Sequence, residues 1–107
     1  MDVFWKLVIA HMVGDWWAQS DSVAQRKNHL SNPMPAVPWY YWLSAHAIIH
    51  GGLVTAVTGS TWLGIAESLT HGVCDYAKCD GWITLHQDQA LHLICKVAWA
   101  YVAVSCV

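Results

Sequence analysis

Two short stretches in the second half of the chain decide the fold: residues 67–75 read ESLTHGVCD and residues 87–92 read QDQALH. Each stretch places an imidazole and a carboxylate four residues apart, so that on a helix both side chains leave the same face about one turn apart. Imidazoles and carboxylates at this spacing can converge on a metal ion when two helices face each other. The two stretches therefore predict a pair of helices with polar inner faces.

The same four-residue spacing occurs twice more, in the first half of the chain. The four pairs are His11 and Asp15, His46 and His50, His71 and Asp75, and Asp88 and His92. A lone histidine on an apolar helix face is more typical of a hydrogen-bonded core residue than of a metal ligand. Four pairs favour a shared metal site, and the alternative is an interior hydrogen-bond network or proton relay without a metal.

The composition indicates one domain, residues 1–107, rich in apolar and amphipathic side chains. Of the 107 residues 56% are hydrophobic and only 11% are charged, against about 25% charged in typical soluble domains. Eight Trp and four Tyr against one Phe are typical of a membrane–water interface, where amphipathic rings gather. A net charge of -2 without a basic run gives no expectation of nucleic acid as a partner.

The apolar segments predict four helices, at about 3–19, 39–58, 61–78 and 88–106. Three prolines within residues 33–38 forbid a continuous helix there and give a linker. Helices of this length with short connections favour an all-α, antiparallel up-down four-helix bundle. Because about 20 predominantly apolar residues span a bilayer, we expect the bundle to be transmembrane.

All four pairs should lie near one end of such a bundle, the end that carries the first and third connections. Those connections also hold Arg26, Lys27 and Lys78, whereas only Lys6 lies near the opposite end. Positively charged loops stay in the cytoplasm. We therefore expect an integral protein of the bacterial inner membrane, with this polar end at the cytoplasmic leaflet.

The pairs also predict which ion the site would bind. An aspartate at the centre of a membrane helix costs about 3 kcal/mol even on lenient scales, and a divalent cation removes that cost by neutralising the carboxylates. Five imidazoles and three carboxylates suit transition metals such as Zn, Mn, Fe or Co better than Ca or Mg, which prefer oxygen ligands. Eight candidate ligands are too many for one tetrahedral ion and suit a di-metal-type site, in which a carboxylate bridges two ions. We therefore expect one or two ions, with zinc as the favoured metal.

Three further polar residues fall on the same helix faces. Gln19 follows Asp15 by one turn, Glu67 precedes His71 by one turn and Lys96 follows His92 by one turn. The functional interpretation makes Glu67 a general base or ligand and Lys96 a group that stabilises negative charge on a substrate. The alternative is that Glu67 and Lys96 form a buried ion pair that fixes the helix register.

The order of these motifs resembles a known family. The motifs are His11-x3-Asp15-x3-Gln19 followed by Lys27, His46-x3-His50-Gly51, His71-x3-Asp75-x2-Lys78, and Asp88-Gln89-x2-His92. Together they resemble the domain-of-unknown-function family 3307, small membrane proteins of bacteria and their phages, over nearly the whole chain. This resemblance implies a polytopic membrane protein but no reaction. The pattern is also loosely similar to membrane-bound metal-dependent hydrolases, which favours hydrolysis.

The favoured hypothesis is a membrane-embedded metal-dependent hydrolase. It would act on a phosphoester or similar bond of a lipid or small anionic substrate at the cytoplasmic leaflet. The alternative is a membrane protein that binds or transports metal ions or protons through the same cluster. Electron transfer, with His46 or His50 as a haem ligand, and a partner-binding phage membrane protein are the remaining hypotheses. The expected partner is the lipid bilayer, and a homo-oligomer is left open.

Overall fold

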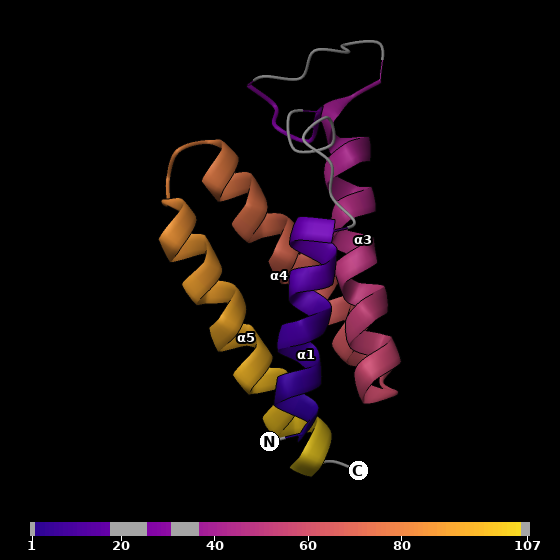
Figure 1. Ribbon diagram of the computed structural model, residues 1–107. Helices are drawn as coiled ribbons and strands as arrows, with labels where there is room; N and C mark the ends of the chain where they lie inside the picture. Colours follow the sequence, from indigo (N-terminus) through magenta and orange to yellow (C-terminus); the bar gives the residue numbers. More distant parts are fainter. Residues whose placement is uncertain (1, 18–25, 31–36, 106–107) are drawn as a thin grey trace.

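The computed structural model describes residues 2–17, 26–30 and 37–105, and the regular structure within them is entirely helical. The elements are α1 (Asp2–Met12), the π-helical turn η1 (Val13–Trp17), α3 (Trp39–Thr58), α4 (Thr61–Cys79) and α5 (Leu85–Ser105). Successive helices run in alternating directions, and α1 begins at the same end of the molecule as α5 ends (Figure 1). The expected all-α, four-helix architecture is therefore confirmed.

The tight connection between α3 and α4 follows from two adjacent residues. Gly59 adopts a left-handed conformation with φ 74° and donates its backbone N–H to Thr55 O at 2.8 Å. Glycine takes this conformation at no steric cost. Ser60 then caps α4, because its hydroxyl accepts the backbone N–H of Leu63 at 3.3 Å. These two residues reverse the chain and make α3 and α4 an antiparallel hairpin.

The last helix begins at Leu85, one turn before the expected Asp88, because of a capping box. Thr84 N–H donates to the side-chain oxygen of Gln87 at 2.9 Å, and Gln87 N–H donates to the hydroxyl of Thr84 at 3.1 Å. This reciprocal pairing satisfies two backbone donors at the start of a helix. Asp88 consequently lies in the first turn of α5 and is buried.

Two glycines let α3 and α4 approach closely. A Cβ atom added to Gly51 would lie 1.9 Å from Ser68 Oγ, and one added to Gly64 would lie 1.9 Å from Thr55 Oγ1. Small residues at a crossing allow helix backbones to pack at short range. The α3–α4 hairpin is therefore the tightest packing unit of the described structure, and it carries His46, His50 and His71.

The interior divides into an apolar half and a polar half. The apolar cluster, near the ends of the chain, consists of Leu7, Val54, Leu63 and Ala100. The polar half lies toward the opposite end, and among described residues ten polar or charged side chains are buried against seven hydrophobic ones. The buried polar side chains are His11, Lys27, His46, His50, Glu67, His71, Asp75, Asp88, His92 and Lys96. So polar an interior is the reverse of the usual arrangement.

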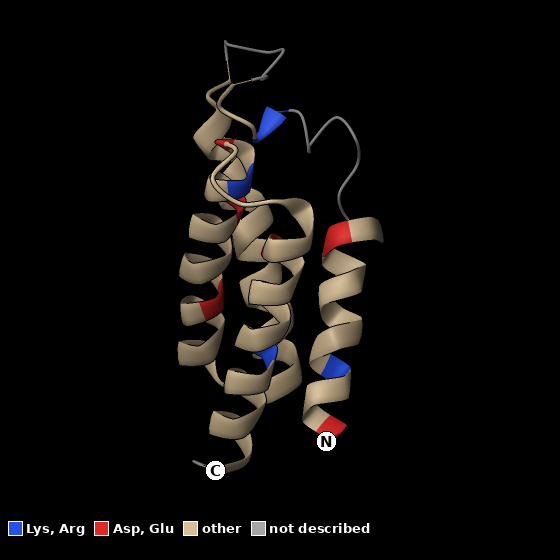
Figure 2. Ribbon diagram, turned by 90° about the vertical axis from the view of Figure 1, so that its left-hand side faces the viewer, with Lys and Arg blue, Asp and Glu red and all other residues tan. Residues whose placement is uncertain are grey.

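The exterior of the helices is correspondingly apolar. Trp62, Leu69 and Tyr101 are 80%, 67% and 72% exposed, and each main helix has further large apolar side chains on its outer face. Few positions along the helices are acidic or basic (Figure 2). Taken as whole segments, however, none of the described helices has both the length and the mean hydropathy required to cross a membrane. The transmembrane part of the expectation therefore finds no support in helix hydropathy.

Candidate metal centre

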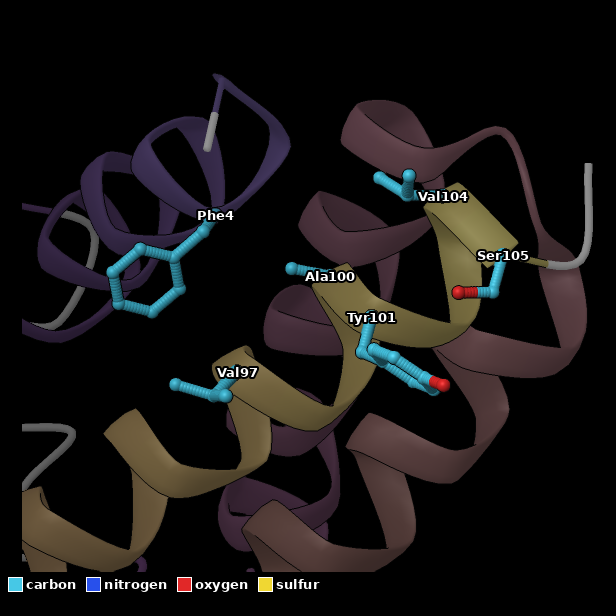
Figure 3. Close-up of a pocket in the computed structure, with 6 residues that line it drawn as sticks. All are labelled: Phe4, Val97, Ala100, Tyr101, Val104 and Ser105. Atoms are coloured by element: carbon cyan, nitrogen blue, oxygen red, sulfur yellow. The ribbon is translucent and has the colours of Figure 1, made fainter.

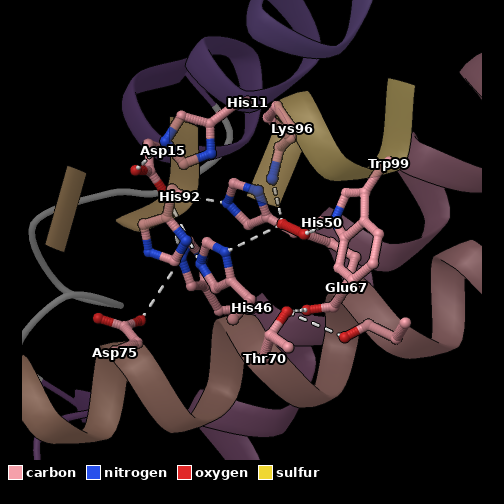
Figure 4. Close-up of polar contacts among 12 residues, drawn as sticks. His11, Asp15, His46, His50, Glu67, Thr70, Asp75, His92, Lys96 and Trp99 are labelled. Atoms are coloured by element: carbon pink, nitrogen blue, oxygen red, sulfur yellow. Dashed lines mark hydrogen bonds and ion pairs between the residues drawn. The ribbon is translucent and has the colours of Figure 1, made fainter. Parts of the chain in front are cut away.

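Asp15 lies at the centre of a group of three imidazoles contributed by α3 and α4. Its Oδ1 is 2.9 Å from His50 Nε2, 3.4 Å from His46 Nε2 and 3.9 Å from His71 Nε2. The ligand atoms of these four residues all lie within 4.8 Å of one another. Side chains from η1, α3 and α4 thus point into one small volume (Figure 4).

This group fits a transition-metal ion. Zinc–nitrogen and zinc–oxygen bonds of about 2.0–2.1 Å in a tetrahedron place neighbouring ligand atoms about 3.3 Å apart, and the three distances to Asp15 Oδ1 bracket that value. His46 Nε2 and His50 Nε2 are buried and face Asp15 Oδ1, but neither forms a well-aligned hydrogen bond among the described residues. A buried polar atom left unsatisfied costs about 1–3 kcal/mol. A cation at this position would take both imidazole lone pairs and neutralise Asp15.

The local backbone of the first helix is adapted to this group. At Val13–Trp17 the helix changes from α to π, a rare geometry that is often found at functional sites. Within this turn, a Cβ atom on Gly14 would lie only 2.6 Å from Cε1 of His50. A glycine is therefore required for the His50 ring to reach Asp15.

The imidazoles form a continuous stack across the bundle. The ring centroids of His50 and His71 are 3.7 Å apart with an interplanar angle of 18°, and those of His71 and His92 are 4.2 Å apart at 24°. The ring of His11 lies 5.0 Å from that of His92. The structure thus brings all five predicted histidines into one cluster, although only three of them face Asp15 Oδ1.

His11 is held by Gln89, which belongs to one of the motifs that carry the family resemblance but was not predicted as a site residue. Its Nε2 lies 3.0 Å from Gln89 Oε1 and 3.2 Å from Asp15 Oδ2, while Gln89 Nε2 donates to Asp15 Oδ2 at 3.0 Å. Gln89 therefore bridges His11 and the central carboxylate. It lies beside Asp88 and off the four-residue spacing, so that spacing gave no signal for it.

Two of the predicted carboxylate ligands are paired with lysines. Asp75 Oδ2 accepts from Lys27 Nζ at 2.5 Å, and Asp75 Oδ1 lies 3.2 Å from Lys78 Nζ. Asp88 lies 3.7 Å from the same Lys78 ammonium and 3.1 Å from His92 Nε2. Burial opposes the charge of Lys78, but Asp75 and Asp88 outweigh it and raise the pKa of this ammonium above its ordinary value. The lysines therefore already neutralise these two carboxylates.

Glu67 and Lys96 contact each other in the interior. The Lys96 ammonium donates to Glu67 Oε1, and the Trp99 indole N–H donates to Glu67 Oε2 at 2.8 Å. Glu67 Oε1 also lies 3.6 Å from His71 Nδ1. These contacts are those of a buried ion pair; the general-base role of Glu67 stays a prediction. Trp99, which lies on the same face of α5 as Lys96, was missed because an indole reads as an apolar residue.

A short segment closes the polar end of the cluster. Besides the contact between Lys27 and Asp75, Arg26 lies 5.0 Å above the ring of Trp42. His29 pairs with Asp80 at 2.7 Å and stacks on Tyr76 with centroids 4.4 Å apart. Residues 26–30 are therefore fixed to both α3 and α4. Gln19, which the sequence places on the same helix face as Asp15, lies outside the described residues.

An apolar groove lies at the other end of the molecule and contains none of these groups (Figure 3). It runs between α1 and α5 and is lined by Phe4, Val97, Ala100, Tyr101, Val104 and Ser105. The groups capable of acid–base or metal chemistry are thus separate from the open apolar surface.

Nearly the whole chain is similar in sequence to a known protein family. A sequence model of the family described as "Protein of unknown function (DUF3307)" matches residues 3–107. The chain belongs to this family. The match includes every residue of the cluster, and the resemblance noted in the sequence is confirmed. No curated protein and no solved structure matches the chain. The membrane character and the likeness to hydrolases stay predictions, and the chemistry must be argued from the site.

Proposed function

We propose that this protein is a metal-dependent hydrolase embedded in a membrane. The observation that carries the proposal is the convergence of three buried imidazoles on one carboxylate oxygen, Asp15 Oδ1. Histidine nitrogens with one carboxylate form a donor set found in catalytic zinc sites. The ion would be held by Asp15, His46, His50 and His71, and water or substrate would take a fifth coordination position. Zinc is favoured over Mn, Fe or Co.

The surroundings of this group support hydrolysis of an anionic substrate. A bound divalent ion polarises a phosphoryl oxygen and makes water a nucleophile near neutral pH. Lys78 is the partly exposed ammonium among the lysines of the described cluster, with 27% of its side chain accessible, and we expect it to meet a substrate phosphate. Gln89 and His11 hold the second oxygen of Asp15 and orient that carboxylate. The substrate class that fits is a phosphoester of a lipid or of a small anionic molecule.

The distribution of apolar side chains supports a membrane location. Large apolar residues cover the outer faces of α3, α4 and α5 while histidine, lysine and carboxylate groups face inward. Mean hydropathy averages over both faces of a helix. The buried imidazoles and ammonium groups on the inner face therefore lower the mean hydropathy of each helix, although lipid would contact only the outer face. Arg26, Lys27 and Lys78 lie at the polar end, which favours that end at the cytoplasmic leaflet of a bacterial inner membrane.

A second function is supported by the stacked imidazoles. The rings of His50, His71 and His92 lie 3.7–4.2 Å apart, as in a relay for protons or a path for metal ions. This stack runs across the bundle, and the interior near the ends of the chain is the apolar cluster around Leu7 and Val54. Hydrolysis is therefore the better-supported function, and binding or transport of metal ions or protons is the alternative.

The decisive experiment measures metal content and turnover together. The full chain is purified in detergent, its transition metals are quantified by mass spectrometry, and its activity is tested on lipid and small phosphoesters. Asp15→Asn and His50→Ala should lose both metal and turnover. The matched control is His86→Ala, because His86 is exposed and lies outside the cluster. Wild-type protein without a bound transition metal would refute the proposal. Metal without turnover, together with ion or proton flux into vesicles, would establish the alternative.

A further inference from the structure

A second group of candidate ligands lies deeper in the bundle. Glu67, His71 and His92 offer one ligand atom each within 4.8 Å of one another. This inner group shares His71 with the outer group around Asp15. The arrangement has the outline of a two-ion site bridged by a histidine, with Nε2 of His71 toward Asp15 and Nδ1 toward Glu67.

The inner group already contains a positive charge. The Lys96 ammonium contacts Glu67 Oε1, and the Trp99 indole N–H contacts Glu67 Oε2. Lys96 is 1% exposed, so its ammonium is shielded from solvent. A metal ion could take Glu67 as a ligand only by displacing this ammonium. His71 Nδ1, which faces Glu67, has no hydrogen-bond partner among the described residues.

The balance of charge in the cluster also favours a single ion. The described cluster holds four carboxylates and three ammonium groups; these are Asp15, Glu67, Asp75 and Asp88, and Lys27, Lys78 and Lys96. With neutral imidazoles this leaves one net negative charge. One divalent ion would change the net charge of the cluster to one positive charge, whereas two divalent ions would change it to three positive charges. Like charges repel strongly where little water screens them.

We propose that Lys96 takes the place of a second metal ion. Its ammonium neutralises Glu67 and excludes a cation from the inner group, so that the chain binds one ion, at Asp15, His46, His50 and His71. This inference rests on the proposed metal site. It also deepens the proposed function, because the single net positive charge that remains suits an anionic substrate.

Counting metal ions tests this assignment. The full chain in detergent is saturated with Zn²⁺ and, separately, with Co²⁺, freed of excess metal and analysed for ions per chain. The wild type should bind one ion and Lys96→Ala two, because the inner group then has an unpaired carboxylate. Lys78→Ala is the matched control, since it removes an ammonium from Asp75 and Asp88 but leaves the inner group closed. It should still bind one ion.

A second variant keeps the test valid if Lys96→Ala does not fold. Glu67→Gln with Lys96→Met removes both charges of the ion pair together, and it should bind one ion within about threefold of the wild-type affinity. Loss of that ion would make Glu67 a ligand and overturn the inference. Two ions in the wild type, two in Lys78→Ala, or one in Lys96→Ala would overturn it as well. No ion in the wild type would instead refute the proposed metal site itself.

Discussion

His50 Nε2 lies 2.9 Å from Asp15 Oδ1, and this contact joins the first helical segment to α3. The two residues are 35 positions apart in the chain and meet because Gly14 has no side chain. The contact therefore links a backbone feature, the π-helical turn at Val13–Trp17, to the candidate metal group.

Gly14→Ala should weaken metal binding without unfolding the protein. The new methyl group would lie 2.6 Å from Cε1 of His50, so the imidazole must move away from Asp15. We expect Co²⁺ affinity, measured by spectroscopic titration, to fall at least about tenfold, which corresponds to about 1.4 kcal/mol. Gly52→Ala is the control, because a Cβ atom there meets nothing within 4 Å. Equal affinities of the two variants would contradict the role of Gly14.

Gln89→Ala should reduce metal affinity through the ligand Asp15. Gln89 donates to Asp15 Oδ2 and holds His11, and loss of a partner that orients a ligand typically costs about 10–100-fold in affinity. Gln87→Ala is the contrasting variant. Gln87 caps α5, so its loss should lower the free energy of unfolding by about 1 kcal/mol and leave metal affinity unchanged. The opposite pattern would show that Gln89 supports only the fold.

Lys27→Met should destabilise the protein by leaving Asp75 with one ammonium instead of two. Lys27 and Asp75 are 3% and 2% exposed and lie 2.5 Å apart, and removing one member of a buried pair costs about 3–5 kcal/mol. Because Lys78 still faces Asp75, we expect a smaller loss, about 1–3 kcal/mol, in chemical unfolding followed by circular dichroism. Adding Asp75→Asn should recover most of it. A double variant less stable than Lys27→Met would argue that Asp75 is a metal ligand.

Metal binding should be lost on acidification. Protons compete with the ion for imidazole lone pairs, and free imidazole side chains titrate at about pH 6.5. Each of the three histidines in the group around Asp15 must keep its ligating nitrogen free of a proton to hold the ion. Isothermal titration at successively lower pH should show weaker binding toward acid. An affinity independent of pH would indicate an all-carboxylate site instead.

The four helices and their polar faces could be predicted because spacing alone determines which side of a helix a residue occupies. His46, His50 and His71 illustrate this, since each lies on an inward face that its own segment defines. The partners of Asp75 and Asp88 could not be predicted in the same way. They depend on where residues 26–30 pack and on how Lys78 turns back from the end of α4, which are properties of the assembled structure.

The start of α5 could have been predicted from a local signal. Thr84 and Gln87 stand three residues apart before an apolar segment, which is the pattern of a capping box. Their reciprocal hydrogen bonds extend the helix by one turn relative to the expectation. The π-helical turn left no such signal, because Gly14 in a helical segment is compatible with an ordinary α-helix.

The close crossing of α3 and α4 at Gly51 and Gly64 has a consequence for how the molecule is assembled. The hairpin carries three of the four donor residues, whereas the remaining donor, Asp15, comes from a segment that is synthesised before the hairpin. Asp15 can therefore contact the three histidines of the hairpin only after α3 and α4 have been synthesised. An ion bound when these residues meet would link the segment that carries Asp15 to the α3–α4 hairpin.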